Sequence, residues 1–448
     1  MKIGHDARIA IIGAGPSGIT AAKHCLQAGL TNLVVYDRNR EVGGNWVYSD
    51  DVGHSSVYET AHIISSKTWS QYHDFPMPAH YPDYPSHKLL KDYFQSYARH
   101  FGIEPFIQFN TEVKSADKQA DESWALTLHD GRVEYFDHLI VCNGHHWNPR
   151  YPSYDGKFEG EMIHSHHYRT HLPFRNKRVL VIGGGNSAAD IATDVTRHAS
   201  FTAISMRRGY YFIPKIVFGD PPDVANARLK FLPRAFRQKL NYAIWWLATG
   251  GNKRYGLQIP EHGILESHPT LNSDLLQRIR HGDIAPRVDI DHYEGNAVVF
   301  KDGKREEYDA IITATGYIIT HPFFDKSFID YSEGDVKLYL RAFHPQHPTL
   351  YFVGLFQPQG CIWPLADTQS QIVANRILGT WQPPVDMEQH IQAETEQIKR
   401  HYRSAARHTV EVEYHEFQER LFREVPKNAP NWTGVRVNRA KQMEAVGD

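Results

Sequence analysis

Two short glycine clusters have the composition and spacing of phosphate-binding turns. Residues 13–18 read GAGPSG and residues 183–188 read GGGNSA. In such a G-x-G-x-x-G/A motif, the first glycine allows a tight turn, the second lets the backbone approach a pyrophosphate, and the last position lets a helix pack closely on a strand. The helix that begins in the turn directs N–H groups and a partial positive charge at the phosphates. The chain therefore has two candidate dinucleotide sites.

The sequence around the first cluster fits the order strand, turn, helix, strand. Residues 8–12 (RIAII) and 32–36 (NLVVY) are predicted strands, and residues 16–29 are a predicted helix. Asp37 lies 19 residues after Gly18, where a carboxylate binds ribose hydroxyls. Glycines also make turns without a ligand, but the register of all these features favours binding. The candidates at this site are Gly13, Gly15, Ser17, Gly18, Asp37 and Arg38.

The second cluster lies in the same order of strand, turn, helix and strand, but the residues after its last strand are different. Residues 178–182 (RVLVI) and 201–206 (FTAISM) are predicted strands on either side of a predicted helix at 187–198. No acid follows the last strand; Arg207 and Arg208 do. Arginine in this place suits a 2′-phosphate and so favours NADP(H) over NAD(H), the alternative being that both arginines are solvated. The candidates are Gly183, Gly185, Asn186, Ser187, Ala188, Arg207 and Arg208.

Two such sites in one chain indicate a flavoprotein supplied by a nicotinamide, with FAD at the first site and NADP(H) at the second. The expected fold is α/β, with two doubly wound, Rossmann-like dinucleotide-binding domains and the NADP domain inserted into the FAD domain. The expected bounds are 1–170 for the first part of the FAD domain, 171–311 for the NADP domain, and 312–448 for the rest with C-terminal helices.

Further elements are predicted along the chain. Strands are expected within 106–141, at 138–142, 309–314 and 349–353, and helices at 86–101, 364–378 and 386–403. A loop is expected from 143 to about 175, and the tail beyond Pro426 lacks periodicity, so that the role of 427–448 stays open.

Residues 210–262 interrupt the second unit. They contain Pro214, Pro221, Pro222 and Pro233, followed by an aromatic helix at 236–248. This excursion is expected to act as a lid. Its residues Tyr242, Trp245 and Trp246 either line a tunnel, fill the lid's own core or face a partner.

Composition narrows the class of protein. The 448 residues suggest two or three domains. A net charge of -2 does not indicate binding to nucleic acid or to an anionic membrane. Three scattered cysteines without a CxxC pair argue against a disulfide framework and fit a reducing compartment. The most apolar helical stretch, 242–248, is far shorter than the roughly 20 residues of a membrane span. We expect a cytoplasmic protein without a leader peptide; a homodimer is compatible with the sequence.

Residues 158–168 (FEGEMIHSHHY) raise the question of a metal site. His164, His166, His167 and His171 lie close together in sequence. They lack regular i, i+4 pairing and the carboxylate or cysteine partners of a zinc site, so no metal is expected.

The spacing Phe158-x-Gly160-x-x-x-His164-x-x-x-Tyr168 resembles the fingerprint of class B flavin-dependent monooxygenases, and its final tyrosine resembles the flavin-containing monooxygenase (FMO) branch. Other segments are similar to that family in the same order: 41–46 (EVGGNW), 74–78 (DFPMP), 141–146 (VCNGHH), 309–317 (DAIITATGY) and 354–369. The resemblance spans most of residues 8–380. It adds six candidate cofactor-binding residues, namely Gly44, Asn45, Trp46, Thr315, Gly316 and Gln369.

The resemblance implies an NADPH- and O₂-dependent enzyme that oxygenates nitrogen or sulfur in amines and sulfides through a C4a-hydroperoxyflavin. One position departs from the family: its active-site Asn falls on Ile64, which cannot donate a hydrogen bond. Ser65, Ser66 and His62 remain as substitute donors, and a register shift of one would place a serine there. Baeyer–Villiger oxidation, an uncoupled NADPH oxidase and a flavin redox sensor stay open, while the missing CxxC speaks against a disulfide reductase.

Overall fold

The chain folds into two compact units. The computed structural model describes residues 2–49, 55–229, 231–264, 266–267, 269–401 and 410–427. The first unit comprises Met1–Val47, Lys67–His145 and Ile318–Asp448, and the second comprises Tyr48–Ser66 and His146–Tyr317. Both contain a parallel sheet and a glycine loop, so the predicted α/β class with two Rossmann-like domains is confirmed. The expected break points at 170 and 311 differ from these bounds, and residues 48–66 group with the second unit.

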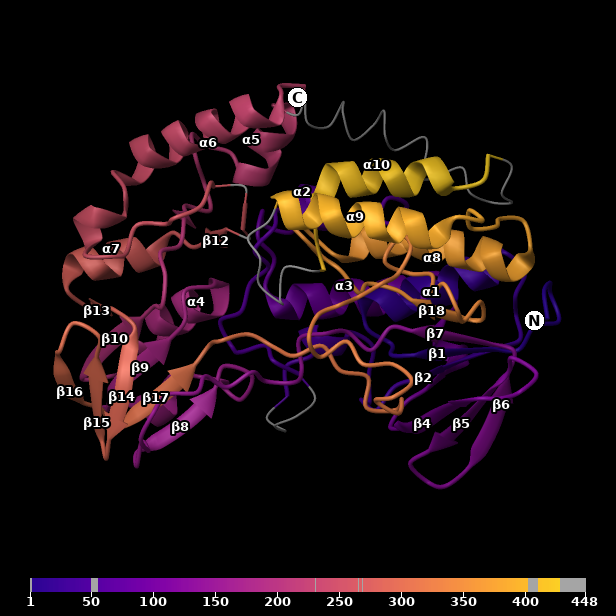
Figure 1. Cartoon of the computed structure of the whole chain (residues 1–448), viewed down its shortest axis with the longest axis horizontal. Helices are drawn as coiled ribbons and strands as arrows, with labels where there is room; N and C mark the ends of the chain where they lie inside the picture. The colour runs from indigo at the N-terminus through magenta and orange to yellow at the C-terminus, as the bar shows by residue number, and fades with distance from the viewer. Residues whose placement is uncertain are drawn as a thin grey trace. The chain divides into compact units, whose positions relative to one another are not determined.

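A five-stranded parallel sheet of order β18-β7-β1-β2-β3 forms the centre of the first unit (Figure 1). An antiparallel sheet, β4-β5-β6, accompanies it. The strands of this unit are β1 (Ile9–Ile12), β2 (Leu33–Tyr36), β3 (Ile107–Gln108), β4 (Val113–Lys118), β5 (Trp124–Leu128), β6 (Val133–Phe136), β7 (His138–Val141), β18 (Leu350–Phe352), β19 (Gln357–Pro358) and β20 (Glu411–Val412). The carboxyl ends of β1, β2, β7 and β18 share one edge, where dinucleotides bind in such sheets.

The helices of the first unit are α1 (Pro16–Gln27), α2 (Lys67–Ser70), α3 (His87–His100), α8 (Trp363–Leu378), α9 (Met387–His401) and α10 (Tyr414–Glu424). A buried charge network joins three of them. Nζ of Lys23 in α1 lies 2.8 Å from Asp367 in α8 and 2.9 Å from Asp74. Burial alone would raise the pKa of Asp367, but the charge of Lys23 and the hydrogen bond with His24 hold it well below its usual range. Tyr97 of α3 donates to the same carboxylate, so α1, α3 and α8 share one ionic centre.

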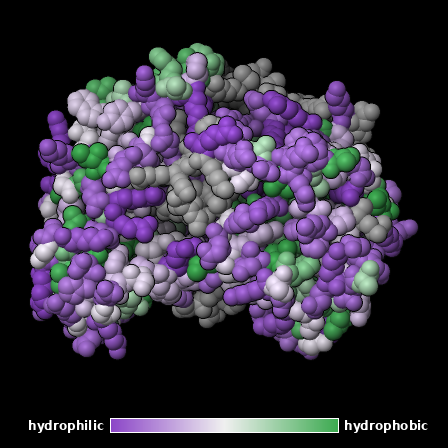
Figure 2. All heavy atoms as spheres, in the orientation of Figure 1, coloured by the Kyte–Doolittle hydropathy of each residue, from purple (hydrophilic) through white to green (hydrophobic). Residues whose placement is uncertain are grey.

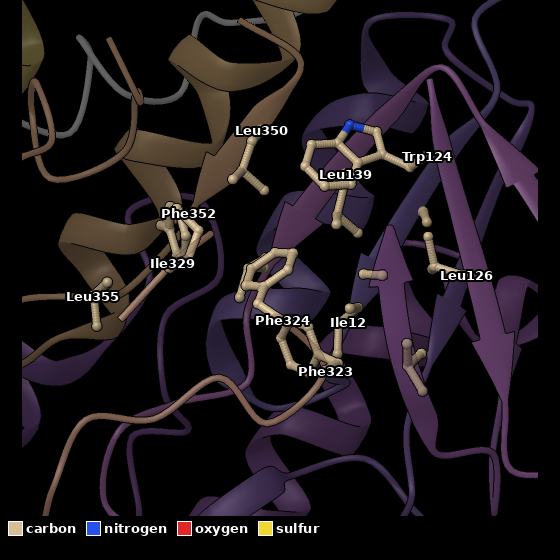
Figure 3. Packing of buried hydrophobic residues seen from close by; sticks show 14 of the residues in the cluster. Ile12, Trp124, Leu126, Leu139, Phe323, Phe324, Ile329, Leu350, Phe352 and Leu355 are labelled. Atoms are coloured by element: carbon tan, nitrogen blue, oxygen red, sulfur yellow. The ribbon is translucent and has the colours of Figure 1, made fainter. Parts of the chain in front are cut away.

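A hydrophobic core fills the space between the two sheets of the first unit (Figure 3). Trp124 of β5, Leu139 of β7 and Phe352 of β18 contribute to it. The segment at 319–338 adds Phe323 and Phe324, whose rings lie close to these strands in Figure 3. The core therefore connects the segment after residue 318 to strands that precede it by almost 200 residues, which makes this part of the chain one unit.

The second unit is built around another parallel sheet, of order β13-β10-β9-β17-β8. Its strands are β8 (Glu161–His164), β9 (Arg178–Ile182), β10 (Phe201–Ser205), β11 (Phe212–Ile213), β12 (Thr270–Leu271), β13 (Ile284–Arg287), β14 (Ile290–Glu294), β15 (Ala297–Phe300), β16 (Arg305–Glu307) and β17 (Ala310–Thr313). Its helices are α4 (Asn186–Val195), α5 (Pro222–Arg228), α6 (Arg234–Thr249) and α7 (Asp274–His281). Strand β8 lies within the segment expected as a loop, and it pairs with β17 in parallel.

The excursion at 210–262 forms α5 and α6 together with a small core of its own. Trp245 is buried there against Tyr211 and Ile264, and its indole N–H donates to the carbonyl of Phe212. Most of α6 is not covered: Phe236, Tyr242, Trp246 and Leu247 are exposed, with Leu247 at 70%. Green spheres at the upper edge of Figure 2 mark apolar residues where Figure 1 places α5 and α6. Trp245 is thus a structural residue of the excursion, whereas its neighbour Trp246 faces outward.

Most of the predicted elements are present with shifts of one to three residues at their ends, and β9 has the predicted bounds. The expectation for the tail beyond Pro426 falls mainly on 428–448, outside the described residues. No helix among the described residues combines the length and apolar character that a membrane crossing requires.

Candidate cofactor-binding and active sites

The first glycine loop, at the carboxyl end of β1, has the shape that a pyrophosphate requires. Gly13 has φ of +107°, and a Cβ there would lie 2.5 Å from the carbonyl oxygen of Cys142. A Cβ on Gly18 would overlap the carbonyl of Gly13 at 1.7 Å, because α1 packs directly on β1. Gly15 precedes α1 in extended conformation, and no side chain caps the helix. Pro16 has no N–H and that of Gly18 donates to the carbonyl of Gly15, so a ligand would meet a helix N-terminus that no side chain caps.

Gly44 and the segment after β18 complete this loop. A Cβ on Gly44 would lie 2.9 Å from Cα of Gly15, so two glycine backbones meet at the start of α1. A Cβ on Gly354 would approach Oγ of Ser17 to 2.3 Å. The Gly-Gly pair of residues 43 and 44 is thus part of the loop's packing. Trp46 follows and packs edge-on against Trp363.

The side chains of Asp37 and Gln369, both candidates at this site, form hydrogen bonds with the backbone of neighbouring loops. The Asp37 carboxylate accepts from the N–H of Ala14 at 2.5 Å and from that of Asn39 at 2.7 Å. It closes the loop from the end of β2, where a carboxylate can also accept from ribose hydroxyls. The Gln369 amide is buried, accepts from the N–H of Gly354 and donates to the carbonyl of Leu340. It shapes the loop at 354 from within α8.

The second glycine loop, at the carboxyl end of β9, is built in the same way. Gly183 has φ of +138°, and a Cβ there would meet the carbonyl oxygen of Ala314 at 2.4 Å. Gly185 precedes α4 in extended conformation, again without a side-chain cap. The side chain of Asn186 accepts from the N–H of Leu271, and Thr270 donates to the carbonyl of Gly184. Strand β12 therefore holds the loop from one side and leaves the helix N-terminus open.

Arg207 and Arg208 differ in their surroundings. Arg207 is exposed. The Arg208 guanidinium lies 5.4 Å from the ring centre of Tyr210, and its Nε and Nη2 atoms are buried without a hydrogen-bond partner among the described residues. Buried guanidinium donors are costly unless an anion satisfies them. Arg208 therefore fits a 2′-phosphate better than Arg207 does.

The carboxyl end of β17 contributes Thr315 and Gly316. The Thr315 hydroxyl donates to the carbonyl of Arg150, and the carbonyl of Gly316 accepts from the N–H of that residue at 2.9 Å. Gly316 has φ of +88°. Both residues therefore fix the chain that leaves the sheet next to the second glycine loop.

The fingerprint residues of the linker are structural within the second unit. The Phe158 ring packs in the core with Tyr293, and a Cβ on Gly160 would collide with that ring. His164 ends β8 and is fully buried; burial lowers its pKa to about 4. The Tyr168 hydroxyl donates to Asp194 of α4 at 2.6 Å. The fingerprint thus anchors the linker to the sheet and to α4.

The neighbouring histidines make aromatic and backbone contacts. The N–H of His166 donates to Nδ1 of His164, the ring of His166 packs on His167, and His171 stacks on His198 at 4.6 Å. Among the described residues, no group of three or more His, Cys, Asp or Glu side chains is arranged to hold a metal ion.

The segment 55–66 contains the position at which the resembled family has its active-site Asn. Ile64 is half-buried there, and Ser65 and Ser66 are buried. The N–H of Ser66 donates to Asp223 of α5 at 2.7 Å. His62 is exposed, with a ring nitrogen 2.9 Å from the carbonyl of Thr60. Asp223 and its helix carry no sequence motif, and only the fold shows their connection to this segment.

Each unit thus gathers one set of candidates. The first unit holds the residues from Gly13 to Trp46 and Gln369; the second holds Gly183 to Arg208, Thr315, Gly316, the fingerprint and Ile64 to Ser66. Each unit has a helix N-terminus without a side-chain cap, at the carboxyl edge of its parallel sheet. This pair of sites defines a two-dinucleotide oxidoreductase.

Known proteins similar to this chain belong to the same class of oxidoreductase. Residues 6–435 match the family model described as flavin-binding monooxygenase-like. Flavin-containing monooxygenase 5 of Rattus norvegicus is 34% identical over 443 residues, which are 92% of this chain and 82% of the relative. Dimethylaniline monooxygenase (N-oxide-forming) 2 of the same species is 34% identical over 387 residues, 81% of this chain and 72% of the relative.

Two solved structures share the fold. S-allyl-L-cysteine S-oxygenase of Allium sativum superposes with a TM-score of 0.71 at 23% identity, covering 98% of this chain and 92% of that one. Cyclohexanone monooxygenase in its open form gives a TM-score of 0.68 at 18% identity, covering 93% and 97%. The chain belongs to the flavin-containing monooxygenase family. It is an NADPH-dependent oxidoreductase that uses FAD and NADP(H).

Proposed function

We propose that this monooxygenase N- or S-oxygenates small amines or sulfides, with NADPH and O₂ as cosubstrates. The observation that carries the use of NADPH is Arg208, whose buried guanidinium donors lack a partner in the described part of the chain. The choice of soft nucleophiles is supported by the tyrosine at the end of the fingerprint and by relatives named for N-oxide formation and S-oxygenation.

The protein's own part is binding and orientation. Bound FAD supplies the redox chemistry that activates O₂. The Gly13–Gly18 loop and the open N-terminus of α1 would hold the FAD pyrophosphate, and Asp37 its ribose. The loop at Gly183 and the open N-terminus of α4 would hold the pyrophosphate of NADP(H), with Arg208 on the 2′-phosphate. Ile64 stands at the position of the active-site Asn of the resembled family.

A second candidate is an NADPH oxidase that releases H₂O₂. Ile64 favours it, because an aliphatic side chain offers no donor in place of the amide of the resembled family. His62 is exposed, and the Ser66 N–H already donates to Asp223.

Product accounting separates these functions from one another and from Baeyer–Villiger oxidation. Purified holoenzyme is incubated with NADPH, O₂ and one of three substrates: trimethylamine, methyl p-tolyl sulfide or cyclohexanone. We expect N-oxide or sulfoxide in near-equal amount to the NADPH consumed. Lactone from the ketone alone would identify a Baeyer–Villiger enzyme. H₂O₂ equal to NADPH with all three substrates would identify an oxidase.

A further inference from the structure

The segment that carries Ile64 is held by the second unit at points along its length. The Arg169 guanidinium donates to the carbonyls of Ser49 and Ser55, at 2.6 and 2.8 Å. The carbonyl of Arg169 accepts from the N–H of Glu59 at 2.8 Å. These bonds fix the entry of the segment. Two carboxylates then hold its middle and its end.

The first carboxylate is Asp190, on the helix that begins at the second glycine loop. It accepts from the Tyr58 hydroxyl at 2.9 Å and from the Asn272 amide at 2.6 Å. Asp190 is half-buried, and the partial loss of solvent raises its pKa. The Tyr58 ring also packs edge-on against Tyr168 of the fingerprint, with centroids 5.8 Å apart. One side chain of the segment therefore contacts both α4 and the linker.

The second carboxylate is Asp223, in the first turn of α5 within the excursion. Its Oδ2 accepts from the Ser66 N–H at 2.7 Å, and its Oδ1 from its neighbour Val224 at 2.9 Å. Ser66 is the last residue of the second unit's first segment, and the next residue, Lys67, donates to carbonyls of Ala79, Tyr81 and Asp83 in the first unit. Asp223 thus holds the segment where it leaves its unit.

We propose that Asp190 and Asp223 are positioning residues that fix residues 58–66, and that this fixing decides whether reducing equivalents reach the substrate. The inference rests on the proposed function. In the productive outcome NADPH, a proton, O₂ and a sulfide give NADP⁺, water and a sulfoxide. In the unproductive outcome NADPH, a proton and O₂ give NADP⁺ and H₂O₂. Ile64 supplies no hydrogen bond of its own, so the segment acts through the placement of its backbone and its apolar side chain, and that placement depends on the two carboxylates.

The excursion then has a second role besides that of a lid, because it holds the segment that carries Ile64. Helix α5 places one acceptor at the Ser66 N–H, two residues after Ile64. A segment fixed at both ends has fewer conformations than one fixed at its entry alone. Loss of the acceptor leaves a buried N–H unsatisfied, which favours local opening.

The test compares Asp223→Ala with Asp223→Asn, because the asparagine carbonyl still accepts from the Ser66 N–H while alanine does not. Asp220→Ala is the matched control. Asp220 lies in the same excursion and is bonded to Arg228, and among the described residues it forms no hydrogen bond or ion pair with residues 58–66. Two readouts are taken on the holoenzymes. Hydrogen–deuterium exchange reports on peptides covering residues 58–66, and H₂O₂ formed per NADPH reports on coupling with methyl p-tolyl sulfide.

We expect exchange of the 58–66 peptides to rise roughly tenfold in Asp223→Ala and to stay near wild type in Asp223→Asn and Asp220→Ala. H₂O₂ per NADPH should rise about threefold or more in the alanine variant and recover in the asparagine variant. Tyr58→Phe should act in the same direction. Its control, Tyr154→Phe, removes a tyrosine–aspartate bond elsewhere in the second unit, to Asp289, and should have no effect.

The two readouts distinguish failure of the positioning role from failure of the proposed function. Unchanged exchange in Asp223→Ala would overturn the positioning role, and raised exchange with unchanged coupling would overturn its link to the reaction. If wild type forms only H₂O₂, the proposed function fails, while the exchange result still decides whether Asp223 holds the segment.

Discussion

The backbone N–H of Ser66 donates to Oδ2 of Asp223 at 2.7 Å, although 157 residues separate the two in sequence. Ser66 lies two residues after the position at which the resembled family has its active-site Asn, and Asp223 lies in the first turn of α5 in the excursion. The bond joins the stretch around Ile64 to a helix of the second unit, the unit that carries the NADP(H) candidates. The excursion is therefore part of the site's framework.

Arg208→Ala should weaken NADPH without affecting NADH. Two buried donor atoms of its guanidinium have no partner among the described residues, and a charge-assisted bond to a phosphate is worth about 1.5–3 kcal/mol. We expect the KM for NADPH to rise roughly 10- to 100-fold. Steady-state kinetics with both nucleotides measure the effect, and Arg207→Ala, at the exposed neighbour, should cost less. Equal losses for NADPH and NADH would contradict the phosphate role.

Gly13→Val should yield protein without FAD. The residue has φ of +107°, and its Cβ would lie 2.5 Å from a backbone oxygen of Cys142, so the loop must deform. The ratio of flavin absorbance to protein absorbance after purification measures occupancy. Gly102→Asn, at a position with open space around it, serves as control and should retain the flavin. Full occupancy in Gly13→Val would show that the first loop is not the FAD site.

Acid should destabilise the second unit through His164. Burial lowers its pKa from 6.5 to about 4, so between these values the unfolded chain binds a proton that the folded chain does not. Stability therefore rises with pH across this window and is lost as pH falls through it, by up to about tenfold in the folding equilibrium per pH unit.

His164→Asn tests this linkage, since the amide oxygen can still accept from the N–H of His166. The variant should be less stable at pH 7, and its Tm should fall less between pH 7 and pH 5 than that of wild type. His129→Asn, at an exposed position, should leave the slope as it is. A slope unchanged in His164→Asn would mean that other groups carry the acid sensitivity.

The sequence predicted those features that depend on neighbouring residues. The glycine loops and the strands and helices beside them are short-range patterns, so β9 (Arg178–Ile182) and the loop at Gly183 were found where the structure has them. The edge strand β8 was missed because it is short, half-exposed and without alternation, and it exists only through its pairing with β17.

The long-range features of the site could not be predicted in this way. Sequence order suggested that residues 48–66 belong with the first glycine loop, but their bonds to Arg169, Asp190 and Asp223 group them with the second unit. No local pattern reports a bond across more than 100 residues. The same holds for Arg208, which differs from Arg207 only through the burial that the fold imposes.

The central claim is that this protein transfers an oxygen atom from O₂ to a soft nucleophile. The most direct measurement is mass spectrometry of the product formed from methyl p-tolyl sulfide by holoenzyme and NADPH under ¹⁸O₂. The account predicts sulfoxide carrying one ¹⁸O atom, in near-equal amount to the NADPH oxidised. NADPH oxidation that yields ¹⁸O-labelled hydrogen peroxide and no labelled sulfoxide would contradict it.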